Sequence, residues 1–217
     1  MAFAGWPRSA FTFYAGLEAD NSKAYWTAHR ATFDDDVAAP LEDLVAELEP
    51  ELGEARRMRP YRDIRVSKDK SVYRTSYGAR LGDAMVGVSA QGLGVGGGMR
   101  HLQRDQLERY REAVAADRSG EALQTAIARL EGAGFDVYGT DQLRTAPRGY
   151  PADHPRADLL RNKGLIAWKR WPPTERWIGT AGAKDRIVAA IAESEPLRAW
   201  LREHVGATTL ERRRPGR

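Results

Sequence analysis

The spacing of apolar residues changes from a helical period to an alternating one and back again, and this change constrains the fold most. Helical spacing runs through residues 11–17, 21–33 and 40–50, with Pro40 suited to the first turn of the third helix. Asp20 or Asn21 is expected to cap the second helix. The N-terminal part of the chain is therefore expected to form a helical layer.

Alternating, glycine-rich segments follow the helical layer. A pair of strands is expected around a turn at Gln91-Gly92, and further strands at residues 64–66, 135–138 and 165–168. Helical spacing returns in residues 104–116, 121–131, 187–191 and 196–205. The pattern predicts one α+β domain over residues 1–206, with a mostly antiparallel sheet between helical layers from both ends of the chain. Residues 207–217 are expected to form a basic, solvated tail.

Composition excludes several classes of protein. The chain has 217 residues, of which 42% are hydrophobic, enough to bury a core. It has no cysteine, so disulfides, thiolate metal sites and a cysteine nucleophile are excluded. No apolar run reaches the length of about 18 residues that a spanning helix needs, and the N-terminus lacks the pattern of a signal peptide. We expect a soluble, cytoplasmic protein with no membrane partner.

The basic charge of the chain is unevenly distributed. The isoelectric point is about 9.4 and the net charge is +4, but residues 207–217 alone contribute +3. The rest of the chain is almost neutral, so overall basicity is weak support for a nucleic-acid partner. Any electrostatic argument must rest on a local concentration of charge.

Such a concentration lies in residues 59–74, RPYRDIRVSKDKSVYR, here called the basic segment. It holds six basic residues against two acidic ones. Arginine grips phosphate or carboxylate with a planar fork, and lysine acts as a point charge. One interpretation is a binding site for an anionic small molecule, and the other is a solvated, salt-bridged hairpin. The candidate ligand-binding residues in the basic segment are Arg62, Asp63, Arg65, Ser67, Lys68, Lys70, Tyr73 and Arg74.

A glycine run gives a second candidate. Gly92 to Gly97 formally match a dinucleotide-binding fingerprint, but no strand–helix–strand context surrounds them. Gly96, Gly97 and Gly98 are expected instead to lie in a loop that leads into the next helix. Their backbone N–H groups could form an anion nest there. Close packing that leaves no room for a Cβ explains the same glycines equally well.

Further candidates lie later in the chain and carry alternatives of their own. Arg148 is a possible ligand contact, and His154 could act as an acid–base or cap the helix that follows it. If the site is catalytic, His154 or Asp69 is the candidate proton carrier. The tryptophans of residues 168–177 could stack nucleic-acid bases or fill the core. The histidines lack metal-ligand spacing, so no metal site is expected.

The order of these motifs resembles an uncharacterised bacterial and fungal family, domain of unknown function 2461. Its signature, R-x-Y/F-R-D-x-R-F-S-K-D-K-x-P-Y-K, matches the basic segment except for Val66, Val72 and Arg74. Its opening helix, asparagine-containing turn and aromatic helix correspond to residues 11–17, Asn21 and Trp26. The sequences GGGM, QLERYREAV and PRGYPADHP also resemble later segments of the family.

The resemblance shifts the interpretation of the basic segment. A signature centred on charged residues implies a role beyond a solvated face, either as a ligand site or as Arg–Asp pairs that join the sheet to the helical layer. It names no activity, cofactor or oligomeric state. The leading hypothesis is binding of a phosphate- or carboxylate-bearing ligand, with possible catalysis. The alternatives are a nucleic-acid-binding module and a non-enzymatic structural or interaction domain.

Overall fold

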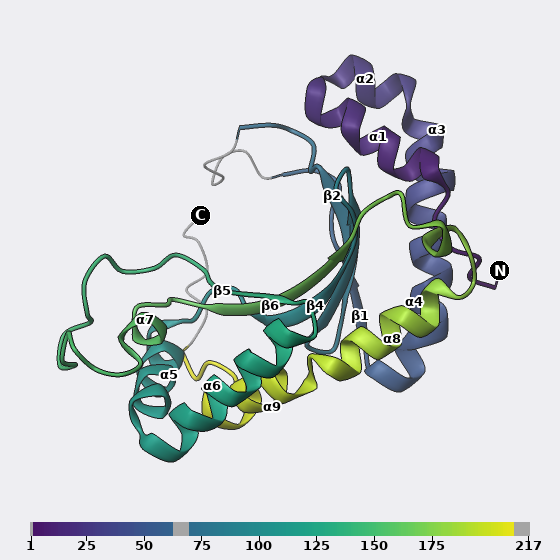
Figure 1. Cartoon of the computed structure of the whole chain (residues 1–217). Coiled ribbons are helices and arrows are strands. Elements are labelled where there is room, and N and C mark those ends of the chain that lie inside the picture. The colour runs from purple at the N-terminus through teal and green to yellow at the C-terminus, as the bar shows by residue number, and fades with distance from the viewer. Residues whose placement is uncertain (1, 63–69, 211–217) are drawn as a thin grey trace. The chain divides into compact units, whose positions relative to one another are not determined.

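A computed structural model describes residues 2–62 and 70–210 of the chain. It divides into two compact units, one formed by Met1–Gly96 and Lys169–Ala192 and the other by Gly97–Trp168 and Glu193–Arg217 (Figure 1). Among the described residues, the strands form a six-stranded sheet in the order β1-β2-β3-β4-β6-β5. The expected α+β class is confirmed, and the expectation of one domain over residues 1–206 stays a prediction.

The first unit opens with a helical layer. Its helices are α1 (Arg8–Ala19), α2 (Lys23–Ala28), α3 (Arg30–Thr32), the π-helix η1 (Phe33–Ala38) and α4 (Ala39–Leu52). The apolar stripes of α1 and α4 are buried as their spacing predicts, with α1 against β3 and α4 against β2 (Figure 1). The helix expected over residues 21–33 is interrupted at His29, the C-cap of α2. The stripe on this helix is only partly buried, because Trp26 and Phe33 are covered and His29 is exposed.

The capping prediction for the second helix is wrong. Ser22 is the N-cap of α2, and its hydroxyl accepts a hydrogen bond from the Tyr25 N–H at 3.1 Å. The side chain of Asn21 is used elsewhere, in contacts with Tyr73. The capping pattern located the correct turn, but the N-cap is Ser22, the residue that follows Asn21.

The strands of the first unit form an antiparallel meander: β1 (Ala55–Arg57), β2 (Ser76–Leu81), β3 (Ala84–Ser89) and β4 (Gly92–Met99), whose last residues belong to the second unit. The turn expected near Gln91-Gly92 joins β3 to β4, which confirms that pair. Gly78 faces Gly87 across β2 and β3, and a Cβ on Gly78 would lie 2.2 Å from the Val86 carbonyl oxygen. The close backbone approach explains why glycine stands there. The strand expected at residues 64–66 lies outside the described residues.

The glycine run is strand rather than loop, so that expectation is wrong. Gly96, Gly97 and Gly98 belong to β4, and the next helix begins only at Arg104. Gly98 has φ +134°, and an added Cβ would lie 2.3 Å from the carbonyl oxygen of Leu165. Close packing, the second interpretation of these glycines, therefore accounts for Gly98. The nest at the start of a helix is not formed by these residues.

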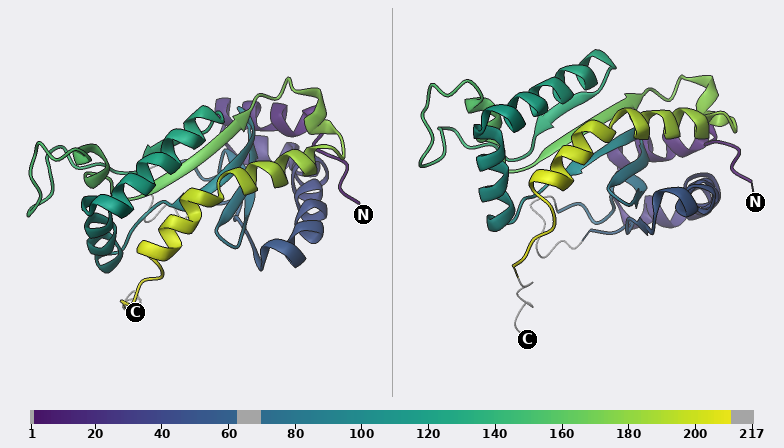
Figure 2. Two further views of the ribbon diagram at one scale, coloured as in Figure 1. Left: turned by 60° about the horizontal axis from the view of Figure 1, so that its bottom comes forward. Right: turned by 90° about the horizontal axis from the view of Figure 1, so that it is seen from below.

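The second unit contains β5 (Asp136–Gly139) and the first residues of β6 (Leu165–Trp171), which pair antiparallel, and a helix packs against β5. Its helices are α5 (Arg104–Ala115), α6 (Asp117–Gly132), α7 (Ala157–Leu160) and α9 (Glu195–His204). The helix α9 runs beside α6 (Figure 2), and the expected helices over residues 104–116, 121–131 and 196–205 are confirmed within a few residues. Arg156 is 5% exposed, and its guanidinium donates to the carbonyls of Val114 and Ala115, the C-terminal end of α5. A buried arginine thus completes the hydrogen bonding of a helix end.

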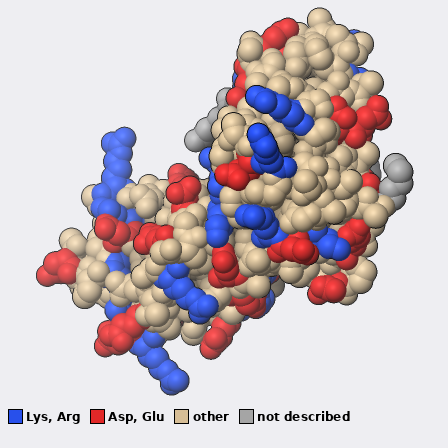
Figure 3. All heavy atoms as spheres, turned by 45° about the vertical axis from the view of Figure 1, so that its right-hand side comes forward, with Lys and Arg blue, Asp and Glu red and all other residues tan. Residues whose placement is uncertain are grey.

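The remaining helices of the first unit follow β6 in the chain. They are the short 3-10 helix η2 (Arg176–Gly179) and α8 (Ala183–Glu193), which carries the expected apolar residues Ile187 and Ile191. Charged side chains of both signs are interspersed over the face drawn in Figure 3. None of the helices in the described part of the chain is long and apolar enough to cross a membrane.

Candidate functional site

The two ends of the basic segment pair with each other as a short antiparallel ladder. Tyr61 and Tyr73 form an isolated bridge, flanked by hydrogen bonds from the Arg62 N–H to the Val72 carbonyl at 2.9 Å and from the Arg74 N–H to the Pro60 carbonyl at 2.8 Å. This ladder, residues 60–62 with 72–74, precedes β2 directly. Side chains alternate in such a pairing, so the two tyrosines lie on one face and the two arginines on the other.

The tyrosine face of the ladder is held by the helical layer. The Asn21 side chain donates to the Tyr73 carbonyl at 3.0 Å and accepts from the Tyr73 N–H at 2.9 Å. The ring of Trp26 stacks on Tyr73 with centroids 4.6 Å apart and lies 5.6 Å from the ring of Tyr61. An amide and three aromatic rings, called here the aromatic stack, therefore join the ladder to α2.

Arg30 extends this contact on the helical side. Its guanidinium lies 5.7 Å from the centroid of Trp26 and pairs with Asp34 at 2.7 Å. The pKa of Arg30 is raised first by the hydrogen bond with Asp34, and Tyr61 contributes to the same rise. Asp34 and the ring of Trp26, its partners, both belong to the helical layer. We therefore assign Arg30 a role in packing.

The opposite face of the ladder carries Arg62 and Arg74, here called the arginine pair. Both are half-buried, and they stand at diagonal positions of the ladder. Burial lowers the pKa of Arg62, and the charge of Arg74 lowers it further. The Nε of Arg74 is buried and has no hydrogen-bond partner among the described residues. A cationic donor in this state is suited to an external acceptor, because buried donors in proteins are almost always paired.

The other predicted residues of the basic segment have different outcomes. Asp63, Arg65, Ser67, Lys68 and Asp69 lie outside the described residues. Lys70 is exposed at the point where the description of the chain resumes. Tyr73 is 5% exposed and stacks under Trp26, so its ring serves packing.

Two of the predicted site residues, Arg148 and His154, lie in the second unit. Arg148 is exposed in the loop between β5 and α7. The Nδ1 of His154 accepts from the Arg156 N–H at 3.0 Å, and its carbonyl accepts from the Ala157 N–H at 2.9 Å. His154 therefore lies in the turn that precedes α7, but the N-cap of α7 is Arg156, so the capping interpretation of His154 is wrong. A role as proton carrier stays a prediction.

Comparison with known proteins supplies the family. The model of the family described as "Conserved hypothetical protein (DUF2461)" matches residues 9–200. The chain belongs to the DUF2461 family. Neither the curated proteins nor the solved structures include a match to it.

The DUF2461 match spans the ladder and also the residues Asn21 and Trp26 that hold it. Asn21 and Trp26, the residues that join the ladder to α2, were not predicted as site residues. The only signal for them in the sequence was the asparagine-containing turn and aromatic helix that resemble the opening of DUF2461. Their partner Tyr73 is 52 residues away from Asn21, beyond the range of any local pattern.

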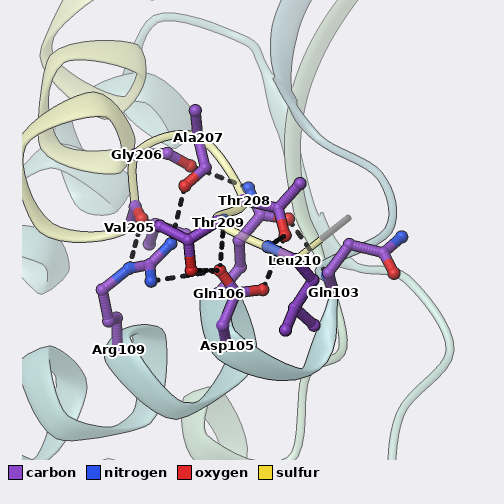
Figure 4. Close-up of polar contacts among 10 residues, drawn as sticks. All are labelled: Gln103, Asp105, Gln106, Arg109, Val205, Gly206, Ala207, Thr208, Thr209 and Leu210. Atoms are coloured by element: carbon purple, nitrogen blue, oxygen red, sulfur yellow. Dashed lines mark hydrogen bonds and ion pairs between the residues drawn. The ribbon is translucent and has the colours of Figure 1, made fainter. Parts of the chain in front are cut away.

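A polar cluster that sequence reasoning missed lies at the end of the DUF2461 match. The Asp105 carboxylate accepts from the Thr209 N–H at 2.8 Å and the Thr208 hydroxyl at 2.7 Å (Figure 4). Arg109 donates to the carbonyls of Val205 and Ala207. These contacts, here called the C-terminal clasp, fix residues 205–209 to the first turns of α5. Because the contacts join segments of this chain to each other, we assign the clasp a structural role.

The tryptophan region is divided between the units. Trp171 and Trp177 meet edge to face at 5.3 Å in the first unit, and both are half-buried. Each is covered by a cation, Lys169 at 5.7 Å and Arg186 at 4.6 Å from the ring centroid. One face of each ring is thus engaged in a cation–π contact and is not open to stacking with a nucleic-acid base. Among the described residues, no three His, Asp or Glu side chains are grouped to hold a metal ion.

Proposed function

We propose that this member of DUF2461 binds a phosphate- or carboxylate-bearing ligand at the arginine pair. The buried Arg74 Nε, unpartnered among the described residues, is the observation that carries the proposal. An unsatisfied buried donor costs about 1–3 kcal/mol, and more when it is charged. An oxyanion accepting from that nitrogen would remove the cost and gain a charge-assisted hydrogen bond.

The chemistry of the pair supports an anion over a neutral ligand. Burial lowers the pKa of Arg62, and the nearby charge of Arg74 lowers it further. A bound anion reverses this repulsion, because it attracts both guanidinium groups at once. The proposal concerns binding, and the geometry of the described residues assigns no catalytic step.

Titration calorimetry of the full chain with inorganic phosphate and with acetate tests the proposal. We expect Arg74→Gln to weaken the binding of whichever anion the wild type takes by about tenfold or more. Arg56→Gln is the matched control, since the Arg56 side chain is 74% exposed on β1 and should not matter. Absence of binding by the wild type, or equal losses in both variants, would remove the proposal.

A structural role is the second candidate, and the aromatic stack favours it. In that case the basic segment serves to join β2 to the helical layer through Asn21 and Trp26. Arg74→Gln would then lower the melting temperature while leaving anion affinity unchanged. A nucleic-acid ligand would instead give oligonucleotide binding whose affinity falls steeply with salt.

A further inference from the structure

One edge of the sheet carries backbone groups that no other described residue binds. β5 stands last in the strand order, so it pairs with β6 on one side only. Its register continues to Thr140, whose N–H donates to the Gly164 carbonyl at 3.0 Å. Because hydrogen-bonded and non-bonded positions alternate along an antiparallel pair, the backbone N–H and C=O groups of Val137 and Gly139 point away from β6. No described residue binds them there.

A cavity of about 370 Å³, called here the β5 cleft, lies along this edge. Val137, Tyr138 and Gly139 all line it, although the side chains of successive strand residues point to opposite faces of a sheet. Contact with three successive residues is therefore typical of a cavity at a strand edge. α6, which lies beside β5 (Figure 2), and α7 supply further walls.

We propose that an extended, basic peptide segment of a partner protein binds in the β5 cleft as an added strand. Addition of a strand to an open sheet edge is a common mode of peptide recognition, in which backbone hydrogen bonds give affinity and pockets for alternate side chains give specificity. The N–H and C=O groups of Val137 and Gly139 supply one side of such a pairing. This proposal goes beyond anion binding, because the arginine pair belongs to the other unit.

The apolar lining of the β5 cleft fits an apolar side chain of the added strand. Ile127, Leu159 and Leu165 line the cleft from three different elements, α6, α7 and β6. Residues two apart in a strand share a face, so only every second side chain of the segment enters the cleft. An apolar residue with a basic residue two positions before and after it therefore presents all three side chains to the cleft.

Charge decides between a peptide and a second copy of this chain. Glu131 and Asp158 are the charged residues in the lining of the cleft, and no lysine or arginine of the described chain lines it. Asp158 pairs with Arg161, whereas Glu131 has no ion pair among the described residues. A second copy that paired through β5 would bring like charges together, whereas a basic segment brings the opposite charge.

Two peptides of one pattern test the charge. The first is lysine-threonine-valine-threonine-lysine with blocked ends, and the second has glutamate in place of both lysines. In heteronuclear NMR titrations of the full chain, we expect the basic peptide to shift the amide signals of Val137 and Gly139. Its affinity should exceed that of the acidic peptide by about threefold or more, as expected for exposed ion pairs. Equal affinities would overturn the basic partner.

Methylation of the peptide backbone tests the added strand. Only alternate N–H groups of a strand point to one neighbour, so methylation of the valine nitrogen and methylation of both threonine nitrogens affect opposite edges. We expect one of these two methylated peptides to bind about threefold or more weakly than the other, because it has lost hydrogen bonds to β5. Equal affinities of the two would show that no strand is added.

A charge reversal on α6 tests the position of the site. Glu131→Lys should weaken binding of the basic peptide by about fivefold and favour the acidic peptide instead. Glu121→Lys is the matched control, since Glu121 is exposed on the same helix and does not line the cleft. Equal effects of the two substitutions would place the peptide elsewhere and overturn the proposal.

The same spectra identify the other outcomes. If the Val137 and Gly139 signals broaden with protein concentration before any peptide is added, the occupant of the edge is a second copy and the peptide is wrong. If neither peptide moves these signals at millimolar concentration, docking at β5 is wrong. Neither result bears on anion binding at the arginine pair, which is measured with different ligands and variants.

Discussion

At the scale of single residues, Asn21 does more for the candidate site than any of the charged residues described. Its amide matches both hydrogen-bonding groups of the Tyr73 backbone, as a neighbouring strand would. Tyr73 is 5% exposed, so water cannot readily replace this partner. The position of the ladder, and with it the arginine pair, therefore depends on a neutral side chain together with the stacked ring of Trp26.

Asn21→Ala is expected to destabilise the protein by about 1–3 kcal/mol, because it leaves a buried N–H and a buried carbonyl unpaired. Chemical denaturation of the wild type and the variant measures this difference. Gln91→Ala is the control, since the Gln91 amide binds Glu18 on the exposed surface. Equal, small effects of both substitutions would show that Asn21 does not hold the ladder in place.

At the scale of elements, the predictions that succeeded rest on local regularity. The stripes of α1, α4 and α9 follow helical spacing closely, and each is buried. The strand β2 was missed, because SYGARL is buried at Tyr77, Gly78 and Ala79 in succession and shows no alternation. The glycines of β4 were misassigned because the residue that crowds Gly98 is Leu165, far away in the chain.

The candidate site shows the same limit of local information. The basic segment was singled out from its charges, and the structure brings Arg62 and Arg74 together as members of one ladder. The sequence could not reveal that Tyr73 faces away from them, since this depends on the pairing of two distant stretches. It also could not identify Asn21 as the residue that holds the ladder in place.

Two glycines allow a matched comparison between a position where close packing requires glycine and a helical position where it does not. Gly98→Ala should destabilise the protein by about 2–4 kcal/mol, because its φ is +134° and the new Cβ would lie 2.3 Å from the Leu165 oxygen. Gly132→Ala, at the end of α6 with no atom within 4 Å of the new Cβ, should stabilise it by about 0.5–1 kcal/mol. Thermal denaturation of both variants measures the signs, and a neutral Gly98→Ala would contradict the packing argument.

At the scale of the whole molecule, some of the contacts that stabilise the chain involve residues beyond the end of the family match. The DUF2461 model ends at residue 200, yet the C-terminal clasp uses residues 205–209. Burial raises the pKa of Asp105, but hydrogen bonds from the Thr209 N–H and the Thr208 hydroxyl outweigh it and hold the pKa well below its usual range. The clasp is therefore a stabilising contact that requires an ionised carboxylate.

The clasp makes stability depend on pH in a defined direction. A pKa lowered by folding contributes stability above the unfolded value near 4, and the contribution is lost as pH falls through the folded pKa. Asp105→Asn should thus lower the urea midpoint at neutral pH, and the gap to the wild type should narrow in acid. Glu108→Gln is the control on the same helix, because the Glu108 side chain is 61% exposed. A gap that stays constant from neutral pH to about pH 3 would exclude this role.

The contact between Asn21 and Tyr73 also has a chemical consequence for the ageing of the protein. Hydrolysis of the Asn21 amide would give an aspartate of nearly the same shape, but an oxygen would then face the Tyr73 carbonyl, where the amide nitrogen now donates at 3.0 Å. A hydrogen bond would become a repulsion between two oxygens. Stored protein that undergoes this change would keep its outline and lose its hold on the ladder, and ion-exchange chromatography would resolve it by its added negative charge.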